Sequence, residues 1–320
     1  MRTFLAITSN AFWELARQPI FLLLLASSCA FSVFTAVVPY FAMDDDIDMV
    51  RDGTLAIMLV AGLLGAVLSA SASLSREIRS GTALAVMSKP IGRTKFLLGK
   101  YFGIAGGLVI LCYCNTLSSL VASRMAYDTY GSADLKGASV WYGFMILAFA
   151  AGGFSNFFLR RGFVSDTVFA FVITQTLAFI VIAFFLDDHV NTYGDEATGV
   201  EWKIIPVAVL VLFAVWLLAA IALACSTRLD TIPTLSVCSV IFLLGLMSDY
   251  LFGRAADAGS FLARIAYGVL PNWQVLWLAD AIHVAGAPWS YVGMSAVYLV
   301  AYLTATLSVG LILFQDRDLS

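Results

Sequence analysis

Long apolar runs alternate with short polar connections along the whole chain, and each run is long enough to cross a membrane. About 18 or more mostly apolar, uncharged residues are typical of a transmembrane α-helix, whereas a membrane barrel would show short strands of alternating polarity. The pattern therefore predicts about eight helical spans, with six also possible. They lie at Ile20–Phe41, Thr54–Leu74, Phe96–Ala122, Val140–Leu159, Val164–Leu186, Ile204–Cys225, Ile232–Phe252 and Tyr291–Phe314.

The overall composition supports this assignment. Of the 320 residues, 61% are hydrophobic and 12% are charged, and the mean hydropathy is +0.92. We therefore predict an all-α polytopic membrane protein whose residues 1–320 form a single transmembrane domain. The apolar run that follows Arg17 is too long for the apolar region of a signal peptide, so we expect it to stay in place as the first span.

The connections between the spans fall into two classes by charge. The basic class contains Arg2, Arg17, the stretch from Arg76 to Lys100, Arg160–Arg161, Arg228 and Arg317. The acidic class contains Asp44–Asp52, Asp128–Lys136, Asp187–Glu201 and Asp249–Asp280. Connections rich in Lys and Arg face the cytoplasm. Both termini are therefore expected to be cytoplasmic, which agrees with an even number of spans.

The connection from Gly253 to Pro288 has a pattern of its own. Apolar residues recur at helical spacing within Phe261–Leu270, Pro271-Asn272 interrupts them, and a second apolar stretch covers Trp273–Val284. Each half is too short to span a membrane. Residues 253–288 are therefore expected to form a helical hairpin that dips into the outer interface, or a lid packed on the bundle; the pattern does not decide between them.

The predicted spans lack charged residues at mid-depth, and all seven prolines lie at or beyond span ends. Secondary transporters commonly show broken helices and ionisable groups within the membrane. If this protein moves a substrate, the energy is therefore expected to come from outside the chain. The five cysteines lie in apolar runs without the spacing of a zinc or CxxC site, so we expect small buried hydrophobic residues.

The stretch "EIRSGTALAVMSKPIGRTKFLLGKYFG" (Glu77–Gly103) concentrates charge that the rest of the chain avoids. Together with Arg76 it holds a third of the chain's 18 Lys and Arg residues. It is not a phosphate loop, because six residues instead of four separate Gly92 from Gly99, and Tyr101 stands where Ser or Thr is required. Nucleotide binding by this chain is therefore not expected.

The same stretch predicts a short helix on the cytoplasmic face. The helix would cover Thr82–Met87 and end before Pro90, since proline disfavours helical geometry in the residue before it. Gly92 would cap the next helix, and Lys100 would lie at the lipid headgroups. Such an element could transmit a displacement caused by a soluble partner to the helix bundle. Alternatively, it could be an amphipathic helix held at the membrane surface by anionic lipid. The physical pattern alone supports both interpretations equally.

Three segments resemble the ABC-2 type transporter permease family. The first segment reads Glu77-x3-Gly81-Thr82, then Ser88-x-Pro90-Ile91-x-Arg93, then Phe96-Leu97-Leu98-Gly99-Lys100-x-x-Gly103. The others are "LPNWQVLWLADAI" (Leu270–Ile282) before the last span and "FQDRDL" (Phe314–Leu319) at the end. The chain departs from the family in two ways. The family's Pro-Ile-Ser-Arg sequence is here Pro90-Ile91-Gly92-Arg93, with glycine in place of serine. The chain also has about eight predicted spans, whereas the family usually has six.

The resemblance implies a permease subunit of an ATP-driven exporter in the cytoplasmic (inner) membrane of a bacterium. Residues 75–100 would be the cytoplasmic coupling segment between spans 2 and 3, docking on a separate ABC ATPase that binds the ATP and Mg²⁺. Two ATPase copies would serve this chain and a second permease copy or a homologous permease, among membrane lipids and without nucleic acid. The residues implied in coupling are Glu77, Arg79, Gly81, Thr82, Pro90, Arg93, Gly99 and Lys100. Arg93 is expected to anchor the segment to a phosphate or a carboxylate.

Other functions are less favoured by the sequence. The alternative function is a non-transporting membrane anchor or signalling subunit of an ABC-like complex. An intramembrane enzyme is not expected, because the spans lack paired carboxylates, HExxH and a Ser-centred turn. Asp44, Asp46 and Asp48 alternate as in a calcium loop, but the following glycine is missing, so no metal site is expected.

The substrate path would be lined by apolar and small polar side chains. Examples within the predicted spans are Asn115, Thr116, Ser118 and Gln175. This lining favours a lipid-like, peptide or amphiphilic substrate over an ion, because an ion would need charged or densely polar partners inside the membrane.

Overall fold

A computed structural model of the protein describes residues 2–38, 46–79, 92–127, 131–186, 199–279 and 286–315. Side chains are described throughout these ranges except at 46, 74–79 and 257. Helices make up most of the described ranges, and no strand occurs within them. The predicted all-α class is therefore confirmed.

The helices follow one another in the order of the apolar runs. They are α1 (Arg2–Ala16), α2 (Pro19–Thr35), α3 (Asp46–Arg79), α5 (Arg93–Met125), α6 (Leu135–Leu159), α7 (Phe163–Phe184), α8 (Ile204–Ser226), α9 (Thr231–Leu246), α10 (Arg254–Asp257), α11 (Phe261–Val269) and α13 (Trp289–Gln315). Two short irregular turns, η1 (Asp249–Gly253) and η2 (Trp273–Leu276), precede α10 and follow α11.

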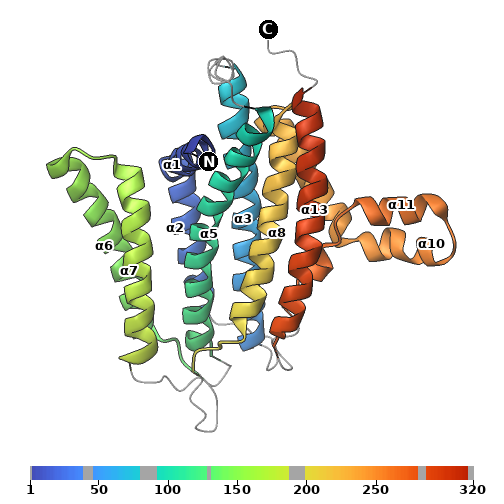
Figure 1. Ribbon diagram of the computed structural model, residues 1–320. Helices are drawn as coiled ribbons and strands as arrows, with labels where there is room; N and C mark the ends of the chain where they lie inside the picture. Colours follow the sequence, from blue (N-terminus) through green and yellow to red (C-terminus); the bar gives the residue numbers. More distant parts are fainter. Residues whose placement is uncertain are drawn as a thin grey trace.

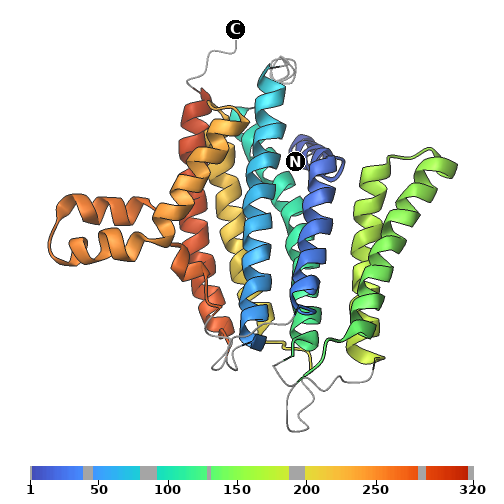
Figure 2. The same ribbon diagram turned by 180° about the vertical axis from the view of Figure 1, so that it is seen from behind.

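The long helices run side by side in one bundle (Figure 1). Helices α2, α3, α5, α8 and α13 form its body, α6 and α7 pair at one side, and α10 with α11 projects from the other side (Figures 1 and 2). Helix α1 and the last turn of α13 lie at the same end, which Figure 1 shows at the top. We call this the upper end and the opposite end the lower end.

The number of spans depends on how bent helix pairs are counted. Helices α3, α5, α6, α7, α8 and α13 are each long and apolar enough to cross a membrane, which gives six. The number rises to eight if the bent pairs α1–α2 and α9–η1/α10 each form one span. The multi-pass character is thus supported by length and composition, and the orientation in the membrane stays a prediction.

The first predicted span is wrong at its C-terminal end, because α2 stops at Thr35 instead of continuing to residue 41. Before it, α1 is a separate helix that the sequence analysis did not anticipate, bent by 63° from α2. The bend falls at Pro19, the first residue of α2, where a missing N–H costs no helical hydrogen bond. Gln18 is extended, with ψ 123°, as expected for a residue before proline.

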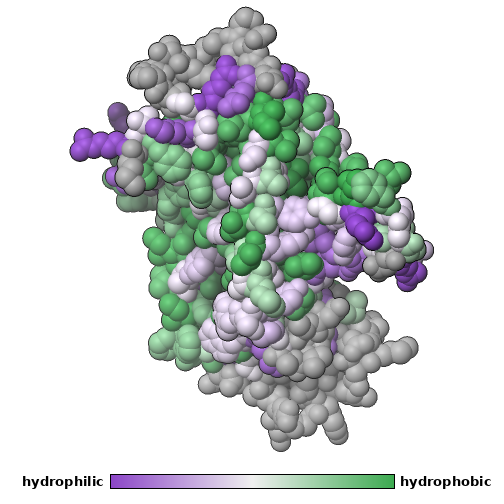
Figure 3. Space-filling view, turned by 45° about the vertical axis from the view of Figure 1, so that its right-hand side comes forward, coloured by the Kyte–Doolittle hydropathy of each residue, from purple (hydrophilic) through white to green (hydrophobic). Residues whose placement is uncertain are grey.

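Apolar side chains fill the interior of the bundle and also cover much of its outer surface. Helices α5 and α8 form the buried centre, where Leu108 and Leu218 are fully enclosed. Large apolar side chains face outward on the outer helices, among them Phe157 on α6 and Val297 on α13. Figure 3 shows apolar residues over much of the side of the bundle, with strongly hydrophilic residues toward the upper end. Exposed apolar surface of this extent is typical of contact with lipid or another protein.

The predicted seventh span, Ile232–Phe252, is interrupted. Helix α9 ends at Leu246, and the chain bends by 61° into η1 and α10. The returning chain packs closely on α9, because a Cβ at Gly245 would lie 2.3 Å from the Pro271 carbonyl oxygen. Only glycine allows such an approach without displacing the backbone.

Helices α10 and α11 form an arm that branches near the middle of α13 (Figures 1 and 2). The Tyr302 hydroxyl donates to the carbonyls of Gly268 (3.1 Å) and Leu270 (3.3 Å). Tyr302 lies thirteen residues from each end of α13, or about 20 Å at 1.5 Å per residue. The first half of the predicted hairpin, Phe261–Leu270, forms α11, but α11 pairs with η1 and α10 before it. The described part of the second half begins with the short turn η2 and contains no further helix up to residue 279, so the predicted pairing is wrong. The position of this connection on an outer face stays a prediction.

Candidate functional site

The residues implied in coupling fall into two groups. Gly81, Thr82 and Pro90 lie outside the described residues, as does the predicted helix Thr82–Met87; Glu77 and Arg79 are in the last turn of α3, and their side chains are not described. Arg93, Gly99 and Lys100 are described in full on the first two turns of α5, which begins directly after Gly92 as expected. The upper ends of α3 and α5 therefore frame the candidate site.

Lys100 is buried in protein, with 1% of its surface exposed. Its Nζ donates to Glu14 Oε2 at 2.9 Å and to Ser73 Oγ at 2.9 Å. Ser73 Oγ in turn donates to Glu14 Oε2 at 3.0 Å. The prediction that Lys100 lies at the lipid headgroups is wrong, because α1 covers it and supplies the carboxylate.

The Glu14–Ser73–Lys100 cluster joins three helices at the upper end. Glu14 comes from α1, Ser73 from α3 and Lys100 from α5. A buried ammonium is tolerated only when it is paired and hydrogen-bonded, so the three helices are expected to hold this arrangement together. Ser73 lies shortly before, and Lys100 shortly after, the 80–91 segment that carries most of the coupling motif. Movement of that segment would therefore reach α1, α3 and α5 at once.

Three glycines make the groove in which α1 lies. Gly99, Gly103 and Gly107 recur every four residues and so share one face of α5. A Cβ at Gly103 would lie 2.5 Å from Ala11 Cβ and 2.5 Å from the Thr8 carbonyl oxygen. Small residues at this spacing let two helices approach closely inside a membrane. Gly99 and Gly103 thus have a packing role in this chain.

The partner face of α1 has the same four-residue spacing. A Cβ at Gly99 would lie 2.8 Å from Ile7 Cγ2, and one at Gly107 would lie 2.2 Å from Leu15 Cδ2. Ala11, between Ile7 and Leu15, meets Gly103. The repeat of Ile7, Ala11 and Leu15 was the signal that could have revealed this contact from the sequence.

Arg93 connects the start of α5 to the end of α13. Its Nη1 donates to the carbonyl of Phe314 at 3.2 Å and also to that of Gln315. The ring of Phe314 stacks on Phe96, with centroids 6.0 Å apart. The last carbonyls of a helix have no partner within it and carry partial negative charge. Within this chain Arg93 therefore binds backbone carbonyls, and its expected contact with a phosphate or a carboxylate stays a prediction.

A second arginine holds the same helix end. The Nε of Arg228, in the turn between α8 and α9, donates to the Leu313 carbonyl at 2.9 Å. The basic connections of the upper end are thus used in part to cap α13. The family-like ending beginning at Phe314 is bound here through its first two residues.

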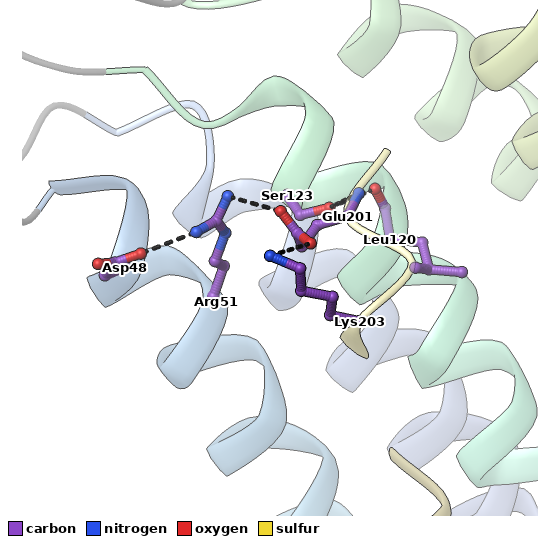
Figure 4. Close-up of polar contacts among 6 residues, drawn as sticks. All are labelled: Asp48, Arg51, Leu120, Ser123, Glu201 and Lys203. Carbon is purple, nitrogen blue, oxygen red and sulfur yellow. Dashed lines mark hydrogen bonds and ion pairs between the residues drawn. The ribbon is translucent and has the colours of Figure 1, made fainter. Parts of the chain in front are cut away.

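Ion pairs from two of the four acidic connections, Asp44–Asp52 and Asp187–Glu201, join helices at the lower end (Figure 4). Arg51 of α3 pairs with Asp48 at 2.9 Å and with Glu201 at 3.2 Å. Lys203 lies 3.9 Å from Glu201, whose backbone N–H donates to Ser123 Oγ on α5 at 3.4 Å. The network links α3, α5 and the start of α8. Asp48, a member of the considered calcium pattern, is thus engaged by an arginine.

A buried ion pair lies near this network. Arg124 Nη1 is 3.5 Å from Asp134 Oδ2, and Arg124 Nη2 donates to the Leu186 carbonyl at 3.1 Å. Asp134 also accepts from the N–H of Gly137 at 2.8 Å and so caps α6. The lower ends of α5, α6 and α7 are thereby fixed to one another, which the sequence alone did not indicate.

The two ends of the bundle differ in what they offer chemically. Side-chain contacts join helices at both ends, and the upper end in addition presents two long helices, α3 and α5, that lead into a basic segment of the sequence. No protein-family model and no curated protein matches this chain.

Proposed function

We propose that the chain is the permease subunit of an ATP-driven ABC-2 type exporter, with a separate cytoplasmic ATPase acting on residues 75–100. The proposal is supported by the multi-pass helical architecture and by the coupling-type motif that starts at Glu77. It also accounts for the basic charge at that segment, which suits an acidic protein surface on the ATPase. The substrate is unidentified.

The observation that carries the proposal is the Glu14–Ser73–Lys100 cluster. It fastens together the two helices that enter and leave the 80–91 segment. Helices α3 and α5 have 34 and 33 residues, or about 50 Å each, and therefore exceed the roughly 30 Å hydrocarbon core. Closely packed interiors transmit displacement with little compression. A displacement of the 80–91 segment would accordingly move α3 and α5 together.

The mechanism requires two such subunits and two ATPases. ATP binding and hydrolysis occur in the ATPases, whose closure would move the two coupling segments. Each segment would shift α3 and α5 together, and α1 would follow through the glycine groove. The lower-end network around Arg51 and Glu201 would have to rearrange for a path to open there. The proposed role of this chain is thus mechanical and positional, without covalent chemistry.

Glu77→Ala is expected to uncouple the complex while the chain still folds and inserts. Loss of one charge-assisted contact of about 1.4 kcal/mol corresponds to about a tenfold change. We therefore expect about a tenfold loss of permease-stimulated ATP hydrolysis in the purified complex reconstituted into liposomes. Lys136→Ala, an exposed site at the lower end, is the matched control and is expected to leave hydrolysis unchanged.

Unchanged hydrolysis by Glu77→Ala would count against coupling through this residue. An ATPase that co-purifies without any stimulation in the unmodified complex would favour the non-transporting anchor.

A further inference from the structure

A pocket of mixed polarity lies in the arm, among η1, α10, α11 and η2. Its volume is about 460 Å³. A carboxylate, a guanidinium, two phenols and an amide line it, from Asp249, Arg254, Tyr250, Tyr267 and Gln274. We call it the arm pocket. Two side chains of opposite charge thus border one space.

The arm pocket lies near the middle of the bundle's height, where the arm branches from α13 (Figures 1 and 2). Apolar side chains of α13 are exposed on both sides of this level, such as Val297 toward the lower end and Val309 toward the upper end. Figure 3 shows hydrophilic residues beside apolar ones on the arm. Charged side chains at this level of a multi-pass protein are costly, and such residues typically mark binding sites or transport paths.

The carboxylate of Asp249 is held by two neutral donors. Its Oδ1 accepts from the Tyr267 hydroxyl at 2.7 Å and from Asn272 Nδ2 at 2.9 Å. Its Oδ2 forms no hydrogen bond or ion pair with a described residue. Gln274 Nε2 donates to the Leu246 carbonyl at 3.1 Å, which leaves Oε1 as a further acceptor. This side of the pocket therefore suits a positively charged donor such as an ammonium group.

The guanidinium of Arg254 is oriented by a ring. Its central carbon lies 5.2 Å from the centroid of Tyr250, and a guanidinium over a ring keeps its N–H donors at its edge. Arg254 and Asp249 line the same pocket, yet no hydrogen bond or ion pair joins these two described side chains. Phosphate and carboxylate groups are the usual partners of such an edge.

We infer that the arm pocket binds a zwitterionic group, whose primary ammonium donates to Asp249 and whose anionic end accepts from Arg254. One ligand with both charges compensates both side chains, whereas an ion of either sign leaves one charge without a partner. A quaternary ammonium does not fit, because it has no N–H to donate to Asp249 or Gln274.

This chemistry has two sources, an aminophospholipid headgroup and a free zwitterion such as phosphoethanolamine. The arm also exposes large apolar side chains on α11, including Phe261, Leu262 and Val269, against which acyl chains can lie. The inference concerns the isolated chain and does not depend on an ATPase.

Arg254→Gln tests the inference in the purified chain in detergent. Native mass spectrometry would compare dioleoyl phosphatidylethanolamine with the phosphatidylcholine and phosphatidylglycerol of the same chains. The unmodified protein is expected to bind phosphatidylethanolamine about tenfold more tightly than either, and Arg254→Gln is expected to lose this preference, because one charge-assisted contact is worth about that factor. Arg264→Gln is the matched control, since Arg264 is exposed on α11 and does not line the pocket.

Asp249→Asn gives the complementary readout at the other end of the ligand. The amide can still accept from Tyr267, but it cannot offset an ammonium, so phosphatidylethanolamine is expected to bind about tenfold more weakly. Phosphoethanolamine without acyl chains separates the two sources. Displacement of the lipid by phosphoethanolamine, or binding of phosphoethanolamine alone, would identify the free zwitterion; binding of the lipid without such displacement would identify the headgroup.

Equal affinity of the unmodified protein for the three lipids, without binding of phosphoethanolamine, would overturn the inference. Unchanged zwitterion binding in both Arg254→Gln and Asp249→Asn would overturn it as well. Because these measurements use the chain alone, their failure would leave the proposed exporter function untouched. Failure of ATPase coupling would equally leave the arm pocket as it is.

Discussion

Glu14→Gln is expected to lower the free energy of unfolding by about 3 kcal/mol, because it removes the Glu14 carboxylate from the buried Lys100 ammonium. The amide oxygen can still accept one hydrogen bond from Lys100 Nζ, but it cannot offset the removal of the charge from water. The measurement is chemical or thermal unfolding of the purified protein in detergent. A loss of this size is large against a typical total stability of about 5–15 kcal/mol.

The double variant Glu14→Gln/Lys100→Met separates the charge effect from packing. Removing both partners by groups of similar size is often nearly neutral, so the double variant is expected to recover most of the loss. Equal destabilisation in the single and double variants would mean that the site is held by shape alone. An unchanged free energy of unfolding in Glu14→Gln would contradict the claim that the ion pair holds α1, α3 and α5 together.

Gly103→Ala and Gly106→Ala are expected to change stability in opposite directions, although the two glycines lie on the same helix. Alanine in place of glycine within a helix normally gains up to about 1 kcal/mol. Among the described residues, an added Cβ at Gly106 would meet only the Phe12 ring within 4 Å, at 3.6 Å. This is an ordinary contact, so the gain is expected in full.

At Gly103 the added Cβ would lie 2.5 Å from the Thr8 carbonyl oxygen and 2.9 Å from the Phe12 backbone nitrogen. Backbone atoms cannot rotate away as a side chain can, so α1 must shift from its groove. Overpacking of this kind costs about 1–3 kcal/mol, and Gly103→Ala is expected to be destabilised by that amount. Faster trypsin cleavage at Arg17 would show that α1 has loosened. Equal stability of the two variants would contradict the close packing of α1 on α5.

The positions of most spans could be predicted because hydropathy alone reveals them. Helix α8 covers Ile204–Ser226 and α13 covers Trp289–Gln315, within two residues of the predictions at each end. In lipid, the backbone N–H and C=O groups of an uninterrupted apolar run can form hydrogen bonds only with one another, so the run must adopt a helix. The pattern therefore determines these elements locally, without knowledge of their neighbours.

The features that the sequence did not predict depend on contacts between residues that lie far apart in the sequence. Glu14 and Lys100 are separated by 86 positions, and nothing local to either residue indicates the other. Helix α1 was overlooked because it is not apolar enough to be a span, although its spacing of Ile7, Ala11 and Leu15 matches the glycines of α5. The sequence predicted α11 as half of a hairpin but not its partner, because α11 packs on η1 and α10 instead of on the stretch after Pro271. The attachment of this arm to Tyr302 likewise arises from tertiary hydrogen bonds.

The candidate site was anticipated only in part for the same reason. Gly99 and Lys100 were selected by resemblance, and the structure gives them packing and ion-pair roles beside the segment. Arg93 was expected to meet an anion, which stays a prediction, and within this chain it meets the carbonyls at the end of α13. A helix end in another part of the sequence presents the same partial charge as an anion, and sequence patterns do not distinguish the two.

A photo-cross-linking amino acid placed at position 95 tests the coupling claim most directly. Lys95 and Lys136 are both exposed. They lie in the first turns of α5 and α6, which begin at opposite ends of the bundle (Figure 1), so position 136 is the matched control. In native membranes, position 95 is expected to cross-link to a protein carrying a P-loop ATPase motif, and position 136 is not. Cross-linking of that ATPase from position 136, or reaction of a Lys95→Cys variant with an impermeant thiol reagent in intact cells, would contradict the account.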